Sequence, residues 1–409
     1  MYENKKTLKD INLDNKKVVV RVDFNVPLKD GKVTNDKRIV AALETINYLL
    51  SHNCSIICLS HLSRIKSLDD INSGKKSLAP VAKRLQELLP NNKVIFMNEN
   101  IGENVKNAAA NLKAGEILLL ENTRYNDVNA NNEVVKKESK NNPELAKEWA
   151  SLGEVFVNDA FGTAHRAHAS NAGIAANIAE SCIGFLVEKE IKNISKAIDN
   201  PARPYVAILG GAKVSDKLKV INNLVNKADK IIVTGGMVYT FLKAQGLEIG
   251  KSICEDEMIP TAKELMAKYG NKLVLTCDSE CAPEYADVKP TYMDHTKPFG
   301  ELMGLDIGPK TIELFNNTLA NAKTVVWNGP CGVSEFENFK AGTEAVAKTL
   351  KDITAKGCYT LIGGGDSAAA VVALGFKETD YSFVSTGGGA CLALIEGSSL
   401  VGIDKISEK

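Results

Sequence analysis

The stretch Tyr205–Lys217, with the sequence YVAILGGAKVSDK, joins an apolar run to two glycines and then to an amphipathic segment. Five apolar residues without polar alternation are typical of a strand buried on both faces, as in a parallel sheet. The glycines permit a tight turn, and the residues from Val214 onward have helical spacing. This strand–turn–helix unit predicts an α/β fold, with helices covering both faces of a parallel sheet.

The same alternation continues along most of the 409 residues. Strands are expected at 18–22, 55–59, 93–96, 117–120 and 155–157, and then at 205–209, 230–233, 273–276, 324–327, 359–362 and 382–384. Helices are expected at 37–50, 79–89, 143–152, 188–198, 214–226, 256–269 and 342–354. The length exceeds what one ordinary core supports. We therefore expect two doubly wound, mainly parallel-sheet, Rossmann-like domains.

The helical pattern Glu188–Ile198, ended by Asp199-Asn200-Pro201, is expected to act as a hinge helix between the domains. The N-terminal domain would then span residues 1–184 and the C-terminal domain residues 185–390. Residues 128–142 are rich in Asn, Lys and Glu, which predicts an exposed loop or a frayed helix.

Composition gives no support to several classes of function, although local basic patches stay open. The formal net charge is zero, which gives no whole-molecule attraction to nucleic acid or to a membrane. No run approaches the roughly 18 apolar residues of a membrane span. The polar start MYENKKTLKD lacks the pattern of a signal peptide, and the nine cysteines are scattered without a C-x-x-C pair. We expect a cytoplasmic protein with reduced thiols.

Arginine is rare in this chain and unevenly placed. Lysine outnumbers it 43 to 7, and six of the seven arginines lie in the first 166 residues. A chain that otherwise uses lysine is expected to keep arginine where a planar fork of donors must bind carboxylate or phosphate.

Polar motifs follow the predicted strands of the first half. They are RVDFNVP from Arg21, SHLSR from Ser60, ENTR from Glu121 and NDAFGTAHRAH from Asn158. Because ligands of open α/β sheets bind beyond the carboxyl ends of the strands, these motifs predict one site for a multiply anionic small molecule. In the first motif Asp23 and Asn25 would bind hydroxyls with Arg21 bracing them. If this motif stood alone, it could instead be a salt bridge at the end of the strand followed by a turn, with no role in binding. The H-x-x-H at His165 lacks zinc spacing and predicts no metal site.

The second half carries glycine clusters at Gly210-Gly211, Gly363-Gly364-Gly365 and Gly387-Gly388-Gly389. Glycine lets backbone N–H groups approach a phosphate, and a following helix N-terminus attracts the anion. Lys213 and Lys217 are four apart on one helix face, and Asp366 is suited to Mg²⁺. One such cluster alone is as consistent with a plain tight turn, but together they predict a Mg-nucleotide site. Trp327 in VWNGP is expected to be a core residue.

The order of these motifs resembles that of the phosphoglycerate kinase family over residues 21–391, on RVDFNVP, SHLxR, NDAFGTAHRAHAS, LGGAKVSDK, VWNGP, GGGDS and VSTGGGA. The resemblance implies a hinge-bending monomer with Mg²⁺. It implies direct in-line transfer of the acyl phosphate of 1,3-bisphosphoglycerate to ADP after closure, giving 3-phosphoglycerate and ATP. It also implies that residues 391–409 return to the N-terminal domain.

Carried onto matching positions, the resemblance implies three sets of site residues. The triose would bind to Asp23, Asn25, Arg38, His61, Arg64, Arg124 and Arg166. The catalytic set would be Arg38, Lys213, Gly365 and Gly388. The nucleotide would bind to Gly211, Lys213, Lys217, Gly235, Gly236, Gly304, Leu305, Asn328, Pro330, Glu335, Gly364, Gly365, Asp366 and Ser367, with Asp366 holding the metal.

Four positions depart from the family pattern. Ser63 and Ile65 stand where Gly and Pro are common, which leaves open a different setting of the loop that carries Arg64. Ser334 and Ser367 stand where Phe and Thr are common, which leaves open a shift in nucleotide preference and affinity. Two other functions also stay open: a different Mg-nucleotide kinase acting on an acyl phosphate or a sugar, and a catalytically silent binding protein. The presence of Arg38, Lys213 and Asp366 favours an enzyme.

Overall fold

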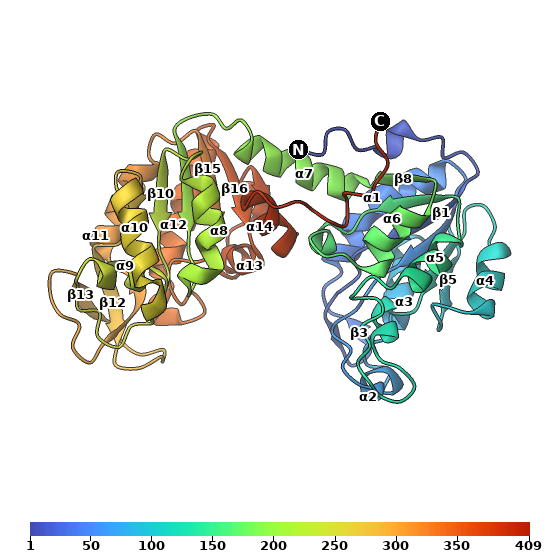
Figure 1. Cartoon of the computed structure of the whole chain (residues 1–409), viewed down its shortest axis with the longest axis horizontal. Coiled ribbons are helices and arrows are strands. Elements are labelled where there is room, and N and C mark those ends of the chain that lie inside the picture. Colours follow the sequence, from blue (N-terminus) through green and yellow to red (C-terminus); the bar gives the residue numbers. More distant parts are fainter. The chain divides into compact units, whose positions relative to one another are not determined.

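The structure is a computed structural model that describes residues 1–409, and the chain divides into two units (Figure 1). Unit 1 comprises Met1–Ile191 and Ser399–Lys409, and unit 2 comprises Lys192–Ser398. The limits expected from the sequence lie after residues 184 and 390. Helix α7 (Phe185–Ile198) contains the first passage from unit 1 to unit 2.

Unit 1 is built on one sheet of six parallel strands in the order β5-β6-β4-β1-β7-β8. These are β1 (Lys17–Arg21), β4 (Ser55–Leu59), β5 (Val94–Met97), β6 (Ile117–Leu120), β7 (Val155–Asn158) and β8 (Glu180–Ile183). β1 lies in the middle, and the chain first builds the sheet on its β4 side and then on its β7 side. β8 was not expected, because its sequence ESCI is short and half polar.

The helices of unit 1 are α1 (Lys37–Ser51), α2 (Leu68–Asn72), α3 (Ala79–Leu88), α4 (Glu103–Ala110), α5 (Pro143–Ala150) and α6 (Ile174–Asn177). A small hairpin joins β2 (Leu28–Lys29) and β3 (Lys32–Val33). Asn142 caps α5, since its side-chain oxygen accepts from the backbone N–H of Leu145 at 3.0 Å, and Pro143 begins that helix.

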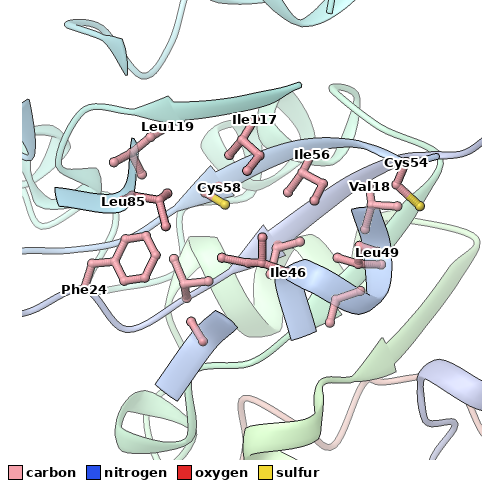
Figure 2. Packing of buried hydrophobic residues seen from close by; sticks show 14 of the residues in the cluster. Val18, Phe24, Ile46, Leu49, Cys54, Ile56, Cys58, Leu85, Ile117 and Leu119 are labelled. Carbon is pink, nitrogen blue, oxygen red and sulfur yellow. The ribbon is translucent and has the colours of Figure 1, made fainter. Parts of the chain in front are cut away.

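The core of unit 1 explains why its strands lack polar alternation. Figure 2 shows Val18 of β1 and Ile56 of β4 beside Ile46 and Leu49 of α1. Val19, on the opposite face of β1, is also fully buried. Both faces of the sheet are therefore covered, which is the condition for an unbroken apolar strand.

Unit 2 has a second sheet of six parallel strands, in the order β11-β10-β9-β15-β16-β17. They are β9 (Tyr205–Leu209), β10 (Lys230–Val233), β11 (Leu273–Val274), β15 (Thr324–Asn328), β16 (Tyr359–Gly363) and β17 (Phe383–Val384). The order reverses between β9 and β15, as in a Rossmann fold. The predicted α/β class with parallel, Rossmann-like sheets is confirmed.

The helices of unit 2 are α8 (Val214–Leu224), α9 (Val238–Ala244), α10 (Ile259–Tyr269), α11 (Pro309–Leu319), α12 (Ala341–Ala355), α13 (Gly365–Ala373) and α14 (Gly389–Ile395). The predicted helix at 256–269 is a 3-10 turn (Asp256–Met258) followed by α10. Trp327 is fully buried, so its prediction as a core residue is confirmed.

Unit 2 also contains a three-stranded antiparallel sheet that the sequence did not predict. It orders β12 (Asp278–Ala282) between β13 (Thr291–Asp294) and β14 (Met303–Ile307). Its strands carry buried acids in place of an apolar run. Asp278, for example, accepts from the backbone N–H groups of Lys310 and Thr311, both at 2.8 Å, at the start of α11.

The C-terminal residues 399–409 pack within unit 1, where Figure 1 draws them in dark red against the blue N-terminal residues. Leu400, Ile403 and Ile406 are buried there. The ammonium group of Lys5 donates to the carbonyls of Asp404 at 2.8 Å and Ile406 at 3.0 Å. This segment completes the core of unit 1.

Residues 128–142 form turns and extended chain, and most of them are exposed. Glu138 departs from the expected loop because it is fully buried. Its carboxylate accepts from the backbone N–H and the hydroxyl of Ser170, which fixes the segment to the helical turn Ala169–Gly173. None of the helices is both long and apolar enough to cross a membrane.

Candidate active site

The first cluster of predicted residues lies beyond β1 and β7, where the strand order of unit 1 reverses. Arg38, in the first turn of α1, donates from Nη1 to Asp23 Oδ1 at 3.1 Å and to the carbonyl of Asn25 at 3.1 Å. The loop after β7 lies close to Asp23, since a Cβ on Gly162 would lie 2.8 Å from Asp23 Oδ2. Asp23, Asn25 and Arg38 are thus held together.

The loop after β4 joins this cluster through the backbone of Ser63. The Ser63 N–H donates to Asn25 Oδ1 at 2.8 Å, and its carbonyl accepts from Arg124 Nη1 at 2.7 Å. Ser63 has φ +60°, the left-handed conformation that glycine favours. The loop therefore takes a glycine-like backbone although a serine occupies the position. Ile65 is buried.

Cationic side chains dominate the electrostatics of this region. Burial lowers the pKa of the half-buried Arg124, and the charges of Arg166 and Arg64 lower it further, against the opposing effect of Asp127. Burial also lowers the pKa of His168 to about 3, with Arg21 and Arg124 adding to the effect. Burial is the largest cause of both shifts, and the arginine charges that add to them show that several cations surround these side chains, which suits a ligand with several negative charges.

The role expected for Arg21 is wrong. Arg21 is fully buried and makes no hydrogen bond to the side chains of Asp23 or Asn25. Its guanidinium donates instead to Ser170 Oγ at 2.8 Å, to the carbonyl of Val22 at 2.5 Å and to His61 Nδ1 at 3.0 Å. It therefore braces His61.

The second cluster lies beyond the strands of unit 2. Gly210 directly follows β9 and lies so close to the Gly329 and Pro330 carbonyls that a Cβ there would collide with them. Gly364, with φ +97°, precedes α13, and Gly388 precedes α14. A Cβ on Gly388 would lie 3.9 Å from the backbone N of Gly365, so two of the predicted phosphate turns are neighbours.

Polar side chains tie these turns to β15. Ser367, fully buried in α13, accepts from the backbone N–H of Gly329 at 2.6 Å. Lys217 donates to Asn328 Oδ1, and Asn328 Nδ2 donates to the carbonyl of Gly363 at 2.9 Å. Burial lowers the pKa of Lys217, while the charge of Asp366 opposes this shift. Lys213 is exposed at the start of α8.

A cavity of about 650 Å³ opens beside these turns. The predicted residues that line it are Gly211, Gly235, Gly236, Gly304, Leu305, Pro330, Glu335 and Asp366. Lys213, Lys217, Asn328, Gly364, Gly365 and Ser367 are not in its lining. Its size and its mixture of apolar walls with few polar groups are those of a small-molecule site.

Sequence reasoning missed several residues of this cavity, chiefly Tyr239, Ile253, Tyr285 and Met303. Tyr285 is 61% exposed, and its hydroxyl donates to Glu335 Oε1 at 3.4 Å. Gly304 accommodates Tyr239, whose hydroxyl would collide with a Cβ at that position. The glycine at 304 is the only signal that could have indicated this close approach.

Asp366 fits the metal that the family resemblance implies. Its carboxylate is exposed in the first turn of α13, lines the cavity and lies within electrostatic reach of Lys217. Mg²⁺ keeps several waters and usually takes only one or two protein carboxylates besides phosphate oxygens. A single exposed carboxylate beside the predicted phosphate turns suits that requirement.

The fold and the two clusters define a kinase built from two α/β units. The sequence profile described as phosphoglycerate kinase matches residues 8–398. Phosphoglycerate kinases of Oenococcus oeni and Listeria innocua are 54% and 55% identical to this chain, over 99% of it and 100% of each relative. The chain therefore belongs to the phosphoglycerate kinase family.

Solved structures agree with this assignment. The phosphoglycerate kinase of Coxiella burnetii matches with a TM-score of 0.85 at 39% identity, and that of Pyrococcus horikoshii with 0.79 at 30% identity. Each match covers 98% of both chains.

Proposed function

We propose that the chain catalyses the reversible transfer of the acyl phosphate of 1,3-bisphosphoglycerate to ADP, giving 3-phosphoglycerate and ATP in glycolysis. Family membership over residues 8–398 supports this activity. The single structural observation that carries it is the group of arginines around Asp23 and Asn25. A phosphorylated carboxylic acid needs such a set of forked donors.

In unit 1 the proposed substrate site comprises Asp23, Asn25, Arg38, His61, Arg64, Arg124 and Arg166. The bond from Arg38 to Asp23 holds this guanidinium in place while leaving its side chain 42% exposed and open to the substrate. The arginines would bind the phosphate and carboxylate, and Asp23 and Asn25 the hydroxyl.

In unit 2 we assign the nucleotide base to the cavity beside Gly235, Gly304 and Leu305, and the ribose to Glu335. The phosphates would lie on the backbone N–H groups at Gly364 and Gly365, with Lys217 as a charged donor. The glycine conformations and the positive N-terminal end of α13 support this placement of the phosphates.

The transfer needs no general base in this proposal. The acceptor in the reverse direction is a carboxylate, ionised at neutral pH because the reference pKa of such groups is about 4. Arg38, Lys213 and the N–H groups of Gly365 and Gly388 would neutralise the oxygens of the moving phosphoryl group during in-line transfer. Mg²⁺, held by Asp366, would supply further charge neutralisation when bound. Since the two sets of residues belong to different units, transfer requires their closure about α7.

We also propose that the protein acts as a cytoplasmic monomer on small-molecule substrates, without nucleic acid or membrane as a partner. The zero formal net charge, which gives no whole-molecule attraction to nucleic acid or membrane, supports the last part of this proposal.

Replacing Lys213 or Arg38 by alanine is expected to lower kcat by a few orders of magnitude, roughly 3–5 kcal/mol of barrier, because each removes a charge that stabilises the transition state. The measurement is a coupled assay in which 3-phosphoglycerate and Mg-ATP form a product that glyceraldehyde-phosphate dehydrogenase reduces with NADH. Lys219→Ala, an exposed lysine on the same helix, is the matched control.

A Lys213→Ala or Arg38→Ala enzyme that keeps more than about a tenth of the wild-type rate would show the role assignment to be wrong. Phosphorylation of glycerate in preference to 3-phosphoglycerate would replace the proposed activity with that of a different kinase.

A further inference from the structure

His61 lies among cationic side chains, and one of them, Arg21, forms a hydrogen bond with its ring. The ring is buried, with Arg21, Arg124, His168 and Arg38 as its electrostatic neighbours. Arg21 Nη2 lies 3.0 Å from His61 Nδ1. A guanidinium has only donors, so Nδ1 must be the acceptor in this bond. The proton of the neutral ring then lies on Nε2.

Arg21 is itself fixed on three sides. Its other nitrogens donate to Ser170 Oγ and to the carbonyl of Val22, and the whole side chain is buried. A rotation that would release Nδ1 must break at least one of these bonds. The orientation of the guanidinium is therefore set by its partners.

Glu138 anchors this arrangement from the segment 128–142. Its two carboxylate oxygens accept from Ser170, Oε1 from the hydroxyl and Oε2 from the backbone N–H at 3.0 Å. Because the Ser170 hydroxyl donates its only proton to Glu138, its oxygen is left to accept from Arg21. Glu138, Ser170, Arg21 and His61 thus form one directed chain of hydrogen bonds.

We infer that Arg21, oriented by Glu138 through Ser170, is a positioning residue that fixes His61 as a neutral donor presenting Nε2–H to the substrate. Nε2 has no hydrogen-bond partner within the protein. The inference rests on the proposed function for its substrate, 3-phosphoglycerate, but concerns the ring in the free enzyme. In the anion site, His61 would supply an oriented hydrogen-bond donor, and the arginines would supply the positive charge.

The first test measures the ring nitrogens of His61 in free enzyme labelled with ¹⁵N-histidine, among the five histidines of the chain. A His61→Gln sample assigns the signals. The expected result is a proton on Nε2 and none on Nδ1 between about pH 6 and 8, the range in which an ordinary histidine titrates. A cationic ring or a proton on Nδ1 at pH 7 would overturn the inference.

The second test uses Arg21→Lys and Glu138→Gln. Lysine keeps the charge but cannot bond three partners in the geometry of the fork, so both tautomers of His61 should appear. The KM for 3-phosphoglycerate should rise roughly tenfold in Arg21→Lys and several-fold in Glu138→Gln, with kcat changed less than about threefold. Glu133→Gln, an exposed position in the same segment, is the control.

Wild-type tautomer signals and KM in both variants would overturn the inference. If Arg21→Lys does not fold, Glu138→Gln decides on the same two readouts. The tautomer is measured without substrate, so this test can fail independently of the proposed function. Failure of the proposed function would instead appear as a wild-type enzyme that is inactive in the coupled assay.

Discussion

At the scale of single residues, Ser63 shows how a departure from the family pattern is accommodated. Its side chain is exposed, and the two bonds that bind the site together come from its backbone. Holding an L-residue in the left-handed region costs about 1–2 kcal/mol. The loop thus keeps the positions of Asn25 and Arg124 at some expense in stability.

Replacing Ser63 by glycine is expected to raise the free energy of unfolding by about 0.5 kcal/mol, since the relief of strain exceeds the entropy that glycine adds to the unfolded chain. Ser63→Val should lower it by about 1–2 kcal/mol because a β-branched residue tolerates this conformation poorly. Urea unfolding measures both changes.

The control is Asn53→Gly, because Asn53 has φ +55° and asparagine tolerates that region. A loss of stability in Ser63→Gly as large as in Ser63→Val would contradict the strain argument.

Asp23, Arg64, Arg124 and Arg166 could be predicted as site residues because each follows a strand whose apolar run is plain in the sequence, whereas Arg38 lies in the first turn of α1. The bracing role of Arg21 could not, since it depends on His61, Ser170 and Glu138, which are distant in the chain. Glu138 lies in a segment whose composition indicates exposure. Tertiary partners, which composition does not report, decide its burial.

At the scale of secondary-structure elements, the start of α7 depends on one buried acid. Asp159, directly after β7, accepts from the backbone N–H of Leu186 at 3.0 Å, and Gly184 leaves room for its carboxylate. Burial raises the pKa of Asp159 to about 7, and its hydrogen bonds offset this only in part. The titratable carboxyl of Asp159 therefore links the loop that carries Arg166 to the first turn of α7.

Asp159 should make unit 1 less stable as the pH rises from about 4 to about 7. In this range the folded protein keeps a proton that the unfolded chain, with a pKa of 3.8, has lost, so the free energy of unfolding falls with rising pH. Asp159→Asn is expected to flatten this fall, which approaches about 1.4 kcal/mol per pH unit at most. Urea unfolding at several pH values measures it.

Asp69→Asn, at an exposed position of α2, is the control and should leave the slope unchanged. A residual slope is expected from Asp306 in unit 2, because burial raises its pKa to about 7 as well. An unchanged slope in Asp159→Asn would show that Asp159 is ionised throughout this range.

Elements with apolar runs, such as β1, β9 and β15, could be placed from the sequence almost to the residue. β8 could not, because it is short and half polar. The antiparallel sheet could not, because Asp278 and Asp306 interrupt its apolar pattern and are buried against the starts of α11 and α12. Periodicity reports only elements whose burial is achieved with apolar side chains.

At the scale of the whole molecule, both ends of the chain belong to unit 1. Besides the bonds of Lys5 to the last residues, Asn158 Nδ2 donates to the carbonyl of Gly402 at 2.9 Å. This bond links the C-terminal segment to the end of β7, next to the residues that carry the proposed substrate site.

Deleting residues 399–409 is expected to lower the free energy of unfolding of unit 1 by about 3–5 kcal/mol, from the loss of three buried apolar side chains less the entropy regained. Trp149 in unit 1 and Trp327 in unit 2 are the two tryptophans, so Trp327→Phe makes fluorescence report unit 1 alone. Lys405→Ala, an exposed change in the same segment, should have little effect. Equal stability of the truncated and full-length chains would contradict the packing argument.

This return of residues 399–409 has a consequence for biosynthesis. Unit 1 receives its first 191 residues early in translation, but its core also needs residues that are made after all of unit 2. Unit 1 therefore cannot complete its folding until unit 2 has been synthesised.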